Sequence, residues 1–306
     1  MLTLTRTLKR VRKLVTGVQL GGHEAAMLVW NGFKVAFGRA PDPENERAYV
    51  SALVSGRLSP SDFLTELTRS AEYISRTPPG TPHPLHQLHA AREMMVRGLP
   101  KAETIVDLGG GAKETAAGAM VFMGYPYPFD TLTIVEPPQA DRHEIYRDAV
   151  PGDPIEYDTG RGVVRYLYTS MADLSPIPSG SVDLVFSGES IEHVTRDECE
   201  RVLAECARVL KPTGSLCFDT PNRAITRLQV GDHGFINPDH KYEYTHAEMV
   251  DAIRRNGLEV VEQKGITWCP SARTGALDLT DMIQNVGVYD DIENSYLLYY
   301  RCRPRG

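Results

Sequence analysis

A glycine-rich turn and the carboxylates around it are the residues of this 306-residue sequence whose types and spacing first suggest chemistry. In TIVDLGGGAKET, residues 104–115, an apolar segment runs into three glycines and then into a helix-like pattern. Glycine permits a positive φ and leaves no Cβ to block a ligand's approach to the backbone. The spacing Asp107-x-Gly109-x-Gly111 departs from the dinucleotide pattern, because Glu114 stands where its last glycine belongs. A carboxylate at the strand end suits a ligand with an ammonium group better than one with a pyrophosphate.

Two further acids follow strand-like segments. Glu136 ends the segment TIVEPP, where a carboxylate can accept both ribose hydroxyls, although this position alone does not separate NAD from other adenosyl ligands. Asp173, beside Leu174, follows the next strand and could accept a hydrogen bond from an adenine amino group. Each acid has a structural alternative, because it could cap a turn, form an Asx turn or be a solvated strand end. Their joint occurrence in this order favours a nucleoside site.

Two histidines could carry out acid–base chemistry on a substrate. His193, in SIEHV beyond the fourth expected strand, lies at the mouth of the expected cleft and can titrate near neutrality. It is therefore a candidate general base for a hydroxyl, the alternative being a histidine that only orders its loop. His240 lies in a polar insertion, residues 219–248, where we expect it to contact the acceptor.

The same insertion offers a second way to activate a hydroxyl. Carboxylates and imidazoles within twelve positions could hold Mg²⁺, although magnesium normally takes mostly oxygen ligands. These residues are Asp232, His233, Asp239, His240 and Glu243. The alternative is a loop whose side chains bond its own backbone or the acceptor hydroxyls, and we favour it slightly over a metal site at Asp232, Asp239 and His240.

The composition narrows the classes of function. The formal net charge of −7 argues against a nucleic-acid partner, because phosphate binding is driven by clustered Lys and Arg. No apolar run approaches the roughly 20 residues that span a bilayer, and no signal-peptide pattern begins the chain, so we expect a cytoplasmic protein. The five cysteines include no Cys-x-x-Cys pair, and we expect reduced, mostly buried thiols.

Four segments would position these residues. Residues 1–22 predict a basic amphipathic helix. We favour its packing on the protein or on a second subunit of a homo-oligomer, the alternative being peripheral contact with the anionic inner face of the membrane. Residues 23–76 predict a helical module, and residues 77–84 predict a stiff proline-rich linker. Residues 85–306 form the larger domain.

Strand and helix patterns alternate through this larger domain. Seven segments rich in β-branched and aromatic residues predict strands. The alternation predicts an α/β fold with a Rossmann-like, seven-stranded, mostly parallel sheet and helices on both faces. Ligands of such sheets bind at the carboxyl ends of the strands.

The larger domain resembles the class I S-adenosylmethionine-dependent methyltransferases of the type 11 kind. The matching segments, in the family's order, are VDLGGG, Glu136, MADL, SGSVDLVFSGESIEHV and RVLKPTGSLCFDTPN. Lys113 departs from the family where a third glycine often stands. The resemblance implies S-adenosylmethionine as cofactor. It also implies these contacts: Asp107, Gly109 and Gly111 at the methionine and ribose, Glu136 at the ribose hydroxyls, Asp173 and Leu174 at the adenine, and Gly188 with Glu189 below the methionine end.

A second resemblance bears on the methyl acceptor. Residues 37–73 resemble a short bacterial module often found beside glycosyltransferases and methyltransferases of cell-envelope polysaccharide assembly. The enzymes that this module occurs beside imply an O-methyltransferase acting on a hydroxyl of a saccharide or glycolipid. A small phenolic or quinone-type acceptor is the alternative, and a non-catalytic, cofactor-binding scaffold protein is a third interpretation.

Overall fold

The computed structural model describes residues 20–37, 39–58, 62–63, 66–67, 70, 72–73, 84–112, 115–142, 156–232, 234–237, 239–278 and 284–306. Most of the helix expected over residues 1–22 and of the linker expected over residues 77–84 therefore lies outside the described residues. Pro84 is the exception in the linker, because it begins a helix. The domain boundaries expected from the sequence stay predictions.

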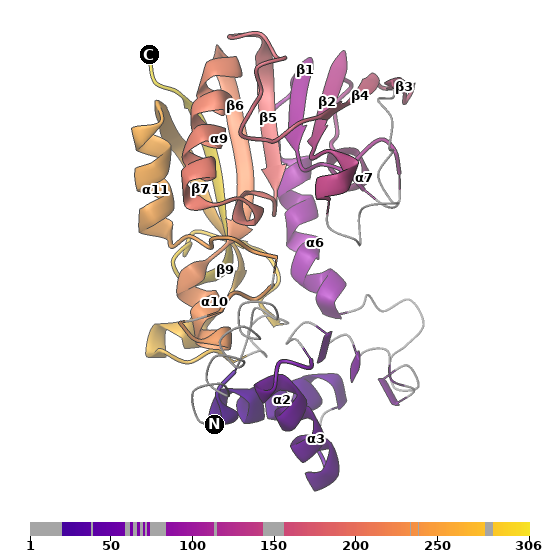
Figure 1. The fold of residues 1–306 in the computed structure, drawn as a ribbon, viewed down its shortest axis with the longest axis vertical. Helices are drawn as coiled ribbons and strands as arrows, with labels where there is room; N and C mark the ends of the chain where they lie inside the picture. The colour runs from indigo at the N-terminus through magenta and orange to yellow at the C-terminus, as the bar shows by residue number, and fades with distance from the viewer. Residues whose placement is uncertain are drawn as a thin grey trace, which may run out of the picture.

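Nine strands form one sheet among the described residues, in the order β3-β4-β2-β1-β5-β6-β9-β7-β8 (Figure 1). They are β1 (Thr104–Leu108), β2 (Thr131–Glu136), β3 (Glu156–Asp158), β4 (Val163–Tyr168), β5 (Val182–Gly188), β6 (Leu210–Pro221), β7 (Leu258–Trp268), β8 (Val288–Tyr289) and β9 (Ser295–Pro304). Strands β4, β2, β1, β5 and β6 run parallel, whereas β9 lies antiparallel between β6 and β7. The predicted α/β, mostly parallel sheet is confirmed. The expected count of seven strands is too low, because the short strands β3 and β8 extend the two edges.

Helices cover both faces of this sheet. They are α6 (Pro84–Arg97), α7 (Ala119–Phe122), α9 (Arg196–Val209), α10 (Arg223–Val230) and α11 (His246–Arg255), with short 3-10 turns η1 (Gln139–Asp141), η2 (Ile191–His193) and η3 (Pro270–Thr274). Successive side chains of a strand point to opposite faces. Val106 of β1 accordingly joins the apolar cluster of α9 and α11, and its neighbour Ile105 joins the cluster of α6 and α7.

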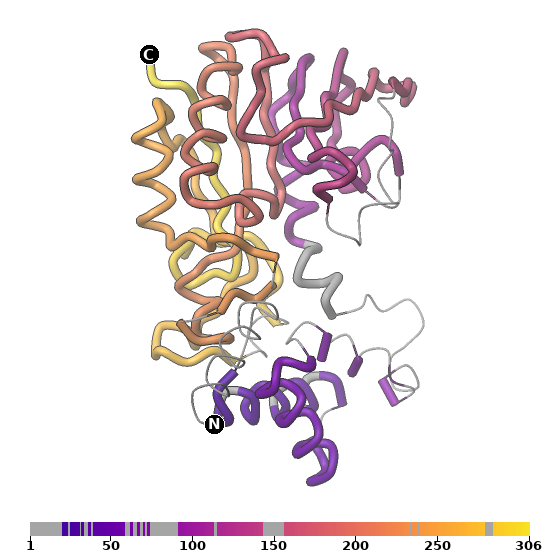
Figure 2. Tube along the Cα trace, in the orientation of Figure 1, coloured from indigo at the N-terminus to yellow at the C-terminus, as the bar shows by residue number. Residues whose placement is uncertain are grey.

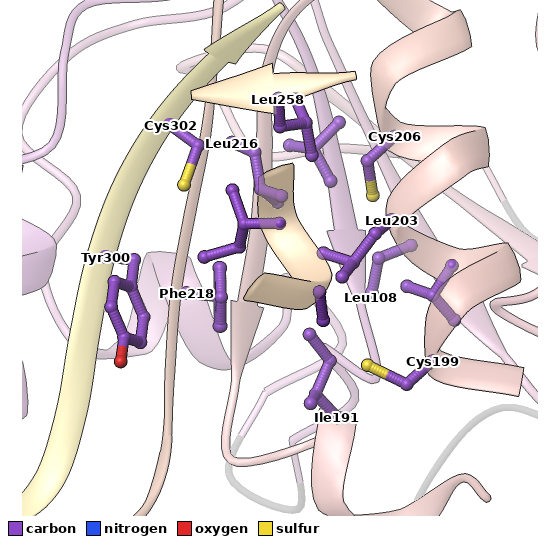
Figure 3. Close-up of a cluster of buried hydrophobic side chains, with 14 of the residues drawn as sticks. Leu108, Ile191, Cys199, Leu203, Cys206, Leu216, Phe218, Leu258, Tyr300 and Cys302 are labelled. Carbon is purple, nitrogen blue, oxygen red and sulfur yellow. The ribbon is translucent and has the colours of Figure 1, made fainter. Parts of the chain in front are cut away.

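The cluster beneath α9 and α11 is the larger of these two apolar layers. Figure 3 shows Leu203 of α9 close to Leu108, at the end of β1, and Phe218 of β6 on the same side of the sheet. All five cysteines are free and buried, as predicted, and Cys199 and Cys206 belong to this cluster. The sheet is thus packed on both faces, and these two apolar clusters hold the ends of its strands in place.

A third apolar cluster joins the N-terminal helices to the sheet domain. Helix α2 (Gly22–Phe37) lies near α10, and α3 (Pro43–Val54) packs against α2, at the opposite end of the molecule from the C-terminus (Figures 1 and 2). Phe33 and Phe63 share buried apolar surface with Ile225 and Val230 of α10 and with Cys269. The described N-terminal helices therefore pack directly against the sheet domain. No described helix combines the length and the apolarity needed to cross a bilayer.

Candidate active site

The glycine turn after β1 covers a buried carboxylate. Asp107 ends β1 with 1% of its surface exposed, and a Cβ on Gly110 would lie 2.1 Å from its Oδ2. Only glycine fits there. Gly109 has φ +72° and donates its N–H to the carbonyl of Val135 at 2.8 Å, which ties the turn to the end of β2. The next described helix, α7, is a single short turn that begins at Ala119, so little helix follows the glycines in the described chain.

The Asp107 carboxylate has no hydrogen-bond partner of ordinary geometry on either oxygen among the described residues. Burial raises its pKa to about 8, and the nearby charge of Glu136 adds to the rise. The backbone N–H of Met120 faces the carboxylate and offsets this rise only in part. An acid held in this state is ready to ionise when a cationic group arrives.

Glu136 lies beside this turn at the end of β2. Its Oε1 accepts the N–H of Gly111 at 2.7 Å, so the carboxylate faces the glycine turn and not open solvent. Burial raises the pKa of Glu136, while the Gly111 N–H and the charge of Arg142 oppose the rise. Arg142 itself lies over the ring of Tyr168, with its Cζ 4.7 Å from the ring centroid. The structure thus brings the three predicted elements, Asp107, the glycines and Glu136, to one place.

Asp173 and Leu174 do not join them in the same way. Asp173 is exposed, and its Oδ1 accepts the N–H of Ser175 at 3.1 Å, which is the Asx turn weighed as its structural alternative. Leu174 is fully buried in the α9 cluster, and its N–H donates to Glu205. Met171 reaches the turn instead, since its Cε lies 4.0 Å from a Cβ placed on Gly109. The adenine contacts assigned to Asp173 and Leu174 therefore lack support from the geometry.

Gly188 and Glu189 follow β5 and meet an arginine from α6. Arg92 places Nη1 3.0 Å from Oε2 of Glu189 and Nε 2.8 Å from Oδ1 of Asp219, at the end of β6. A Cβ on Gly188 would lie 2.4 Å from the Arg92 guanidinium. Burial alone would lower the pKa of Arg92, but the two carboxylates outweigh it and raise that pKa above its usual value. Glu189 takes a left-handed φ of +49°, an uncommon conformation for a residue with a side chain.

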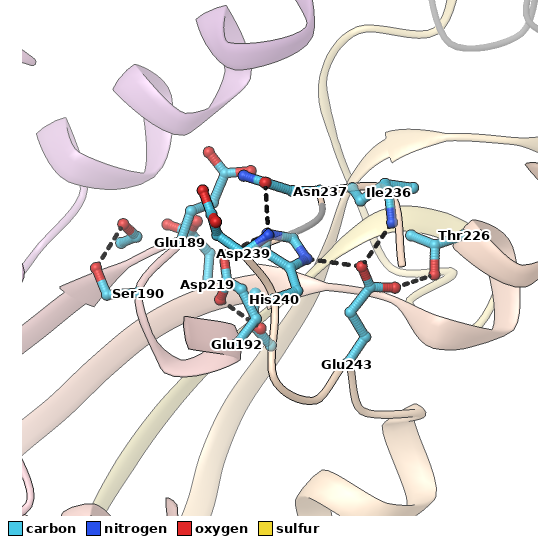
Figure 4. A network of polar contacts seen from close by, with 12 residues as sticks. Glu189, Ser190, Glu192, Asp219, Thr226, Ile236, Asn237, Asp239, His240 and Glu243 are labelled. Carbon is cyan, nitrogen blue, oxygen red and sulfur yellow. Dashed lines mark hydrogen bonds and ion pairs between the residues drawn. The ribbon is translucent and has the colours of Figure 1, made fainter. Parts of the chain in front are cut away.

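The two predicted histidines lie together beyond this ion cluster. Their rings pack edge to face with centroids 4.9 Å apart (Figure 4 shows the polar network around His240). His240 Nδ1 lies 2.7 Å from Oε1 of Glu243, and His240 Nε2 lies 4.0 Å from Oε1 of Glu192. Burial raises the pKa of Glu192 well above its usual value, although the Thr220 hydroxyl donates to its Oε2 at 2.9 Å.

His193 is the member of this pair that solvent reaches. Desolvation of its ring, followed by the charge of His240, lowers the pKa of His193 to about 4. The residue as a whole is exposed, and solvent around it offsets part of this effect. The imidazole is neutral at pH 7 in either case, which makes it free to accept a proton but a weaker base than an ordinary histidine.

The metal site expected at Asp232, Asp239 and His240 is not assembled. Asp232 is exposed, and its backbone carbonyl accepts from Arg223. Among the described residues, the group with metal-ligand geometry is Glu192, His193 and His240. The roles predicted for His193 and His240 stay predictions, and the carboxylate near both rings is that of Glu192.

Three residues of this region were missed by sequence reasoning. Glu192 directly precedes His193 in GESIEHV and could have been found, because both lie at the end of one strand. Arg92 and Asp219 carry no such signal, since they meet Glu189 only after α6 and β6 are placed on either side of β5. Each is a charged residue whose partners are distant in the chain.

The residues at the glycine turn fit S-adenosylmethionine. A buried carboxylate that lacks a hydrogen bond of ordinary geometry in the described part of the chain suits the ammonium end of the ligand, and a second carboxylate at the next strand end suits its ribose. The glycine backbone leaves room for close approach.

Comparisons with known proteins agree with this fit. Residues 142–218 match a family model described as a methyltransferase domain. A protein of Mycolicibacterium smegmatis named as a probable S-adenosylmethionine-dependent methyltransferase is 38% identical over 97 residues, covering 32% of this chain and 36% of that protein. A ubiquinone biosynthesis O-methyltransferase of Burkholderia thailandensis is 32% identical over 107 residues, covering 32% of this chain and 45% of that protein. The matches thus span less than half the length of these curated relatives.

Among solved structures, a SAM-dependent methyltransferase from Archaeoglobus fulgidus aligns with a TM-score of 0.46 at 12% identity, covering 72% of this chain and 93% of that chain. The family match and the sequence relatives support a class I S-adenosylmethionine-dependent methyltransferase domain in this protein, with S-adenosylmethionine as the cofactor.

The state of Asp107 predicts an unusual pH dependence of stability. Because the pKa is about 8 in the folded protein against 3.8 ordinarily, the folded state holds a proton that the unfolded chain releases. Stability contributed by this group therefore falls as pH rises from 3.8 to about 8. Melting temperatures of the Asp107→Asn variant should exceed those of the wild type at pH 8 and approach them near pH 4.

Asp183→Asn is a control, because the pKa of Asp183 is shifted in the opposite direction to that of Asp107. Asp183 accepts from Lys211 at 2.7 Å and from Thr104 at 2.9 Å, and its pKa is lowered despite partial burial. Its stabilising effect is present at neutral pH and lost in acid, so its replacement should destabilise the protein at pH 8. An Asp107→Asn effect that does not change with pH would show that Asp107 is ionised or solvated in the folded protein.

Proposed function

We propose that this protein is an S-adenosylmethionine-dependent O-methyltransferase. The observation that carries the proposal is the buried Asp107 carboxylate, which lies under a glycine turn next to Glu136 and has no hydrogen bond of ordinary geometry among the described residues. When bound, S-adenosylmethionine supplies an electrophilic methyl group on a sulfonium. The protein must then align the acceptor, exclude water and help a hydroxyl lose its proton.

The residues of the strand ends divide these tasks. Asp107 would ionise against the ligand's ammonium group, and Glu136 would accept from the ribose hydroxyls. Arg92 pairs with Glu189 and with Asp219 and offsets part of their negative charge at the floor between β5 and β6. Gly188 and Glu189 then form this floor through their backbone, whose position is set by the ion cluster.

The histidine pair is the proposed site of hydroxyl activation. His193 is exposed, and it follows β5 by only a few residues, so an acceptor in the cleft would meet it first. His240 lies behind it, oriented by Glu243. An imidazole with a pKa near 4 is a weak acceptor for the proton of an alcohol, which is itself a poor acid. We infer that the pair acts together with Glu192, and not through His193 alone.

The lead acceptor class is a hydroxyl of a saccharide or glycolipid in bacterial cell-envelope polysaccharide biosynthesis. It is supported by the resemblance of residues 37–73 to a module found beside enzymes of that assembly. In this proposal the protein is cytoplasmic, and it reaches glycolipids by peripheral contact of its N-terminal segment with the inner face of the membrane.

A small phenolic or quinone-type acceptor is the second candidate. The observation that favours it is the similarity to a ubiquinone biosynthesis O-methyltransferase over 107 residues. A phenol is more acidic than a sugar hydroxyl and would need less activation.

Transfer of tritiated methyl groups separates these candidates. The protein would be incubated with labelled S-adenosylmethionine and either fractionated envelope glycans and glycolipids or a set of catechols and hydroquinones. Label in a glycan or glycolipid fraction is expected. Label only in the phenols would support the second candidate, and cofactor binding without any transfer would favour a scaffold protein.

The role of the histidine pair predicts a split between turnover and cofactor binding. His193→Ala should lower kcat by roughly 10²–10⁴-fold, as expected for loss of a group acting on the acceptor proton. Its affinity for S-adenosylmethionine, measured by calorimetry, should stay unchanged, because the cofactor contacts lie at Asp107 and Glu136. His23→Ala, at an exposed histidine of α2, is the matched control. Equal turnover in both variants would remove His193 from the mechanism.

A further inference from the structure

The ring of His240 lies between two carboxyl groups, with Nδ1 toward Glu243 and Nε2 toward Glu192. Glu243 is buried, and it accepts hydrogen bonds from the Thr226 hydroxyl and from the N–H of Ile236 at 3.1 Å. With donors on both its oxygens, Glu243 acts as the acceptor for His240 Nδ1 at 2.7 Å. The proton of a neutral His240 therefore sits on Nδ1, and Nε2 presents a lone pair.

That lone pair faces Oε1 of Glu192 across 4.0 Å. The distance is too long for a hydrogen bond between them, so the two atoms face each other without being bonded to each other. The ring of His193 lies beside this pair of atoms. One potential ligand atom from each of Glu192, His193 and His240 lies within 4.8 Å of the other two. Two ligand atoms bound at about 2.1 Å to one ion are roughly 3–4 Å apart. A small movement of the three side chains toward one another would therefore bring their ligand atoms to metal-binding distances.

The backbone holds these two segments together. The N–H groups of Lys241 and Tyr242 donate to the carbonyl of Glu192 at 2.7 and 3.2 Å. The turn after β5 and the insertion after β6 are thus joined at the residue that supplies the carboxylate (Figure 4). Such fixing of the ligands, together with a carboxylate behind a histidine, is the arrangement that supports metal ions in proteins.

We propose that Glu192, His193 and His240 bind a divalent transition-metal ion. Two imidazoles and one carboxylate suit Zn²⁺, Mn²⁺, Fe²⁺ or Co²⁺ better than Mg²⁺, which prefers oxygen ligands. This ion and this set of residues differ from the alternative weighed on the sequence, which was Mg²⁺ at Asp232, Asp239 and His240. Exposed His193 leaves the solvent side of the ion open.

This site deepens the proposed function and rests on it for its chemical role. The open side would bind the acceptor hydroxyl and lower its pKa, so that its proton passes to bulk water. The oxygen then forms a bond to the methyl carbon, and the electron pair of the broken carbon–sulfur bond stays on sulfur. His193 serves here as a ligand.

Cobalt titration of the full-length protein tests the site directly. After removal of metal with a chelator and dialysis, Co²⁺ binding is followed by its visible absorption. The wild type should bind one equivalent with saturation, and Zn²⁺ should displace it. Glu192→Gln, which can still accept from Thr220, and His240→Ala should each weaken binding at least tenfold. Asp232→Asn, in the same insertion, should bind as the wild type does.

Absence of saturable Co²⁺ binding would overturn the proposal, as would equal binding by Glu192→Gln and the wild type. A loss in Asp232→Asn as large as that in His240→Ala would return the site to the insertion and would also overturn it. If His240→Ala fails to fold by circular dichroism, Glu192→Gln decides. S-adenosylmethionine calorimetry on the same samples keeps the two ideas apart. Cofactor binding without metal would reject this site alone, whereas metal binding without cofactor would reject the proposed function.

Discussion

Burial of the Asp107 carboxylate is the constraint around which the rest of the cofactor region is arranged. The glycine turn must pass so close to it that a side chain at Gly110 would overlap its oxygens. Glu136, one strand away, makes its ionisation harder, and no described group gives it a hydrogen bond of ordinary geometry. Such a group costs stability in the empty protein and gains its partner only when a cation binds. The strand ends are therefore built for a ligand more than for the fold.

The parts of this region that depend on neighbouring residues in the chain could be predicted from the sequence. The strand that ends at Asp107, the glycines after it and Glu136 all fell where the alternation of strands and helices placed them. The adenine contact of Asp173 stays a prediction, because its Oδ1 accepts the N–H of Ser175 in a local Asx turn. Sequence spacing does not distinguish an acid that bonds its own backbone from one that awaits a ligand.

Contacts between residues that lie far apart in the chain could not be predicted from the sequence. The ion cluster of Arg92, Glu189 and Asp219 joins α6 to the ends of β5 and β6. His240 was correctly placed near the site, but its pairing with Glu192 depends on how the insertion after β6 folds back over the turn after β5. The two short edge strands were also missed, because segments of two or three residues carry little pattern.

Helix α10 connects the N-terminal helices to the histidine pair. Ile225 and Val230 pack in the same cluster as Phe33 and Phe63, while Thr226 of the same helix bonds Glu243, the residue that orients His240. A shift of α10 against the N-terminal helices would therefore reach His240 through two contacts.

Proton release on cofactor binding tests the central role of Asp107 most directly. S-adenosylmethionine would be titrated into the protein at pH 7 by calorimetry in two buffers of different ionisation enthalpy. Because the pKa of Asp107 is about 8 in the free protein, binding of the ammonium group should release close to one proton from the wild type and none from Asp107→Asn. Wild-type binding without proton release, or equal release by the two proteins, would contradict this account of the site.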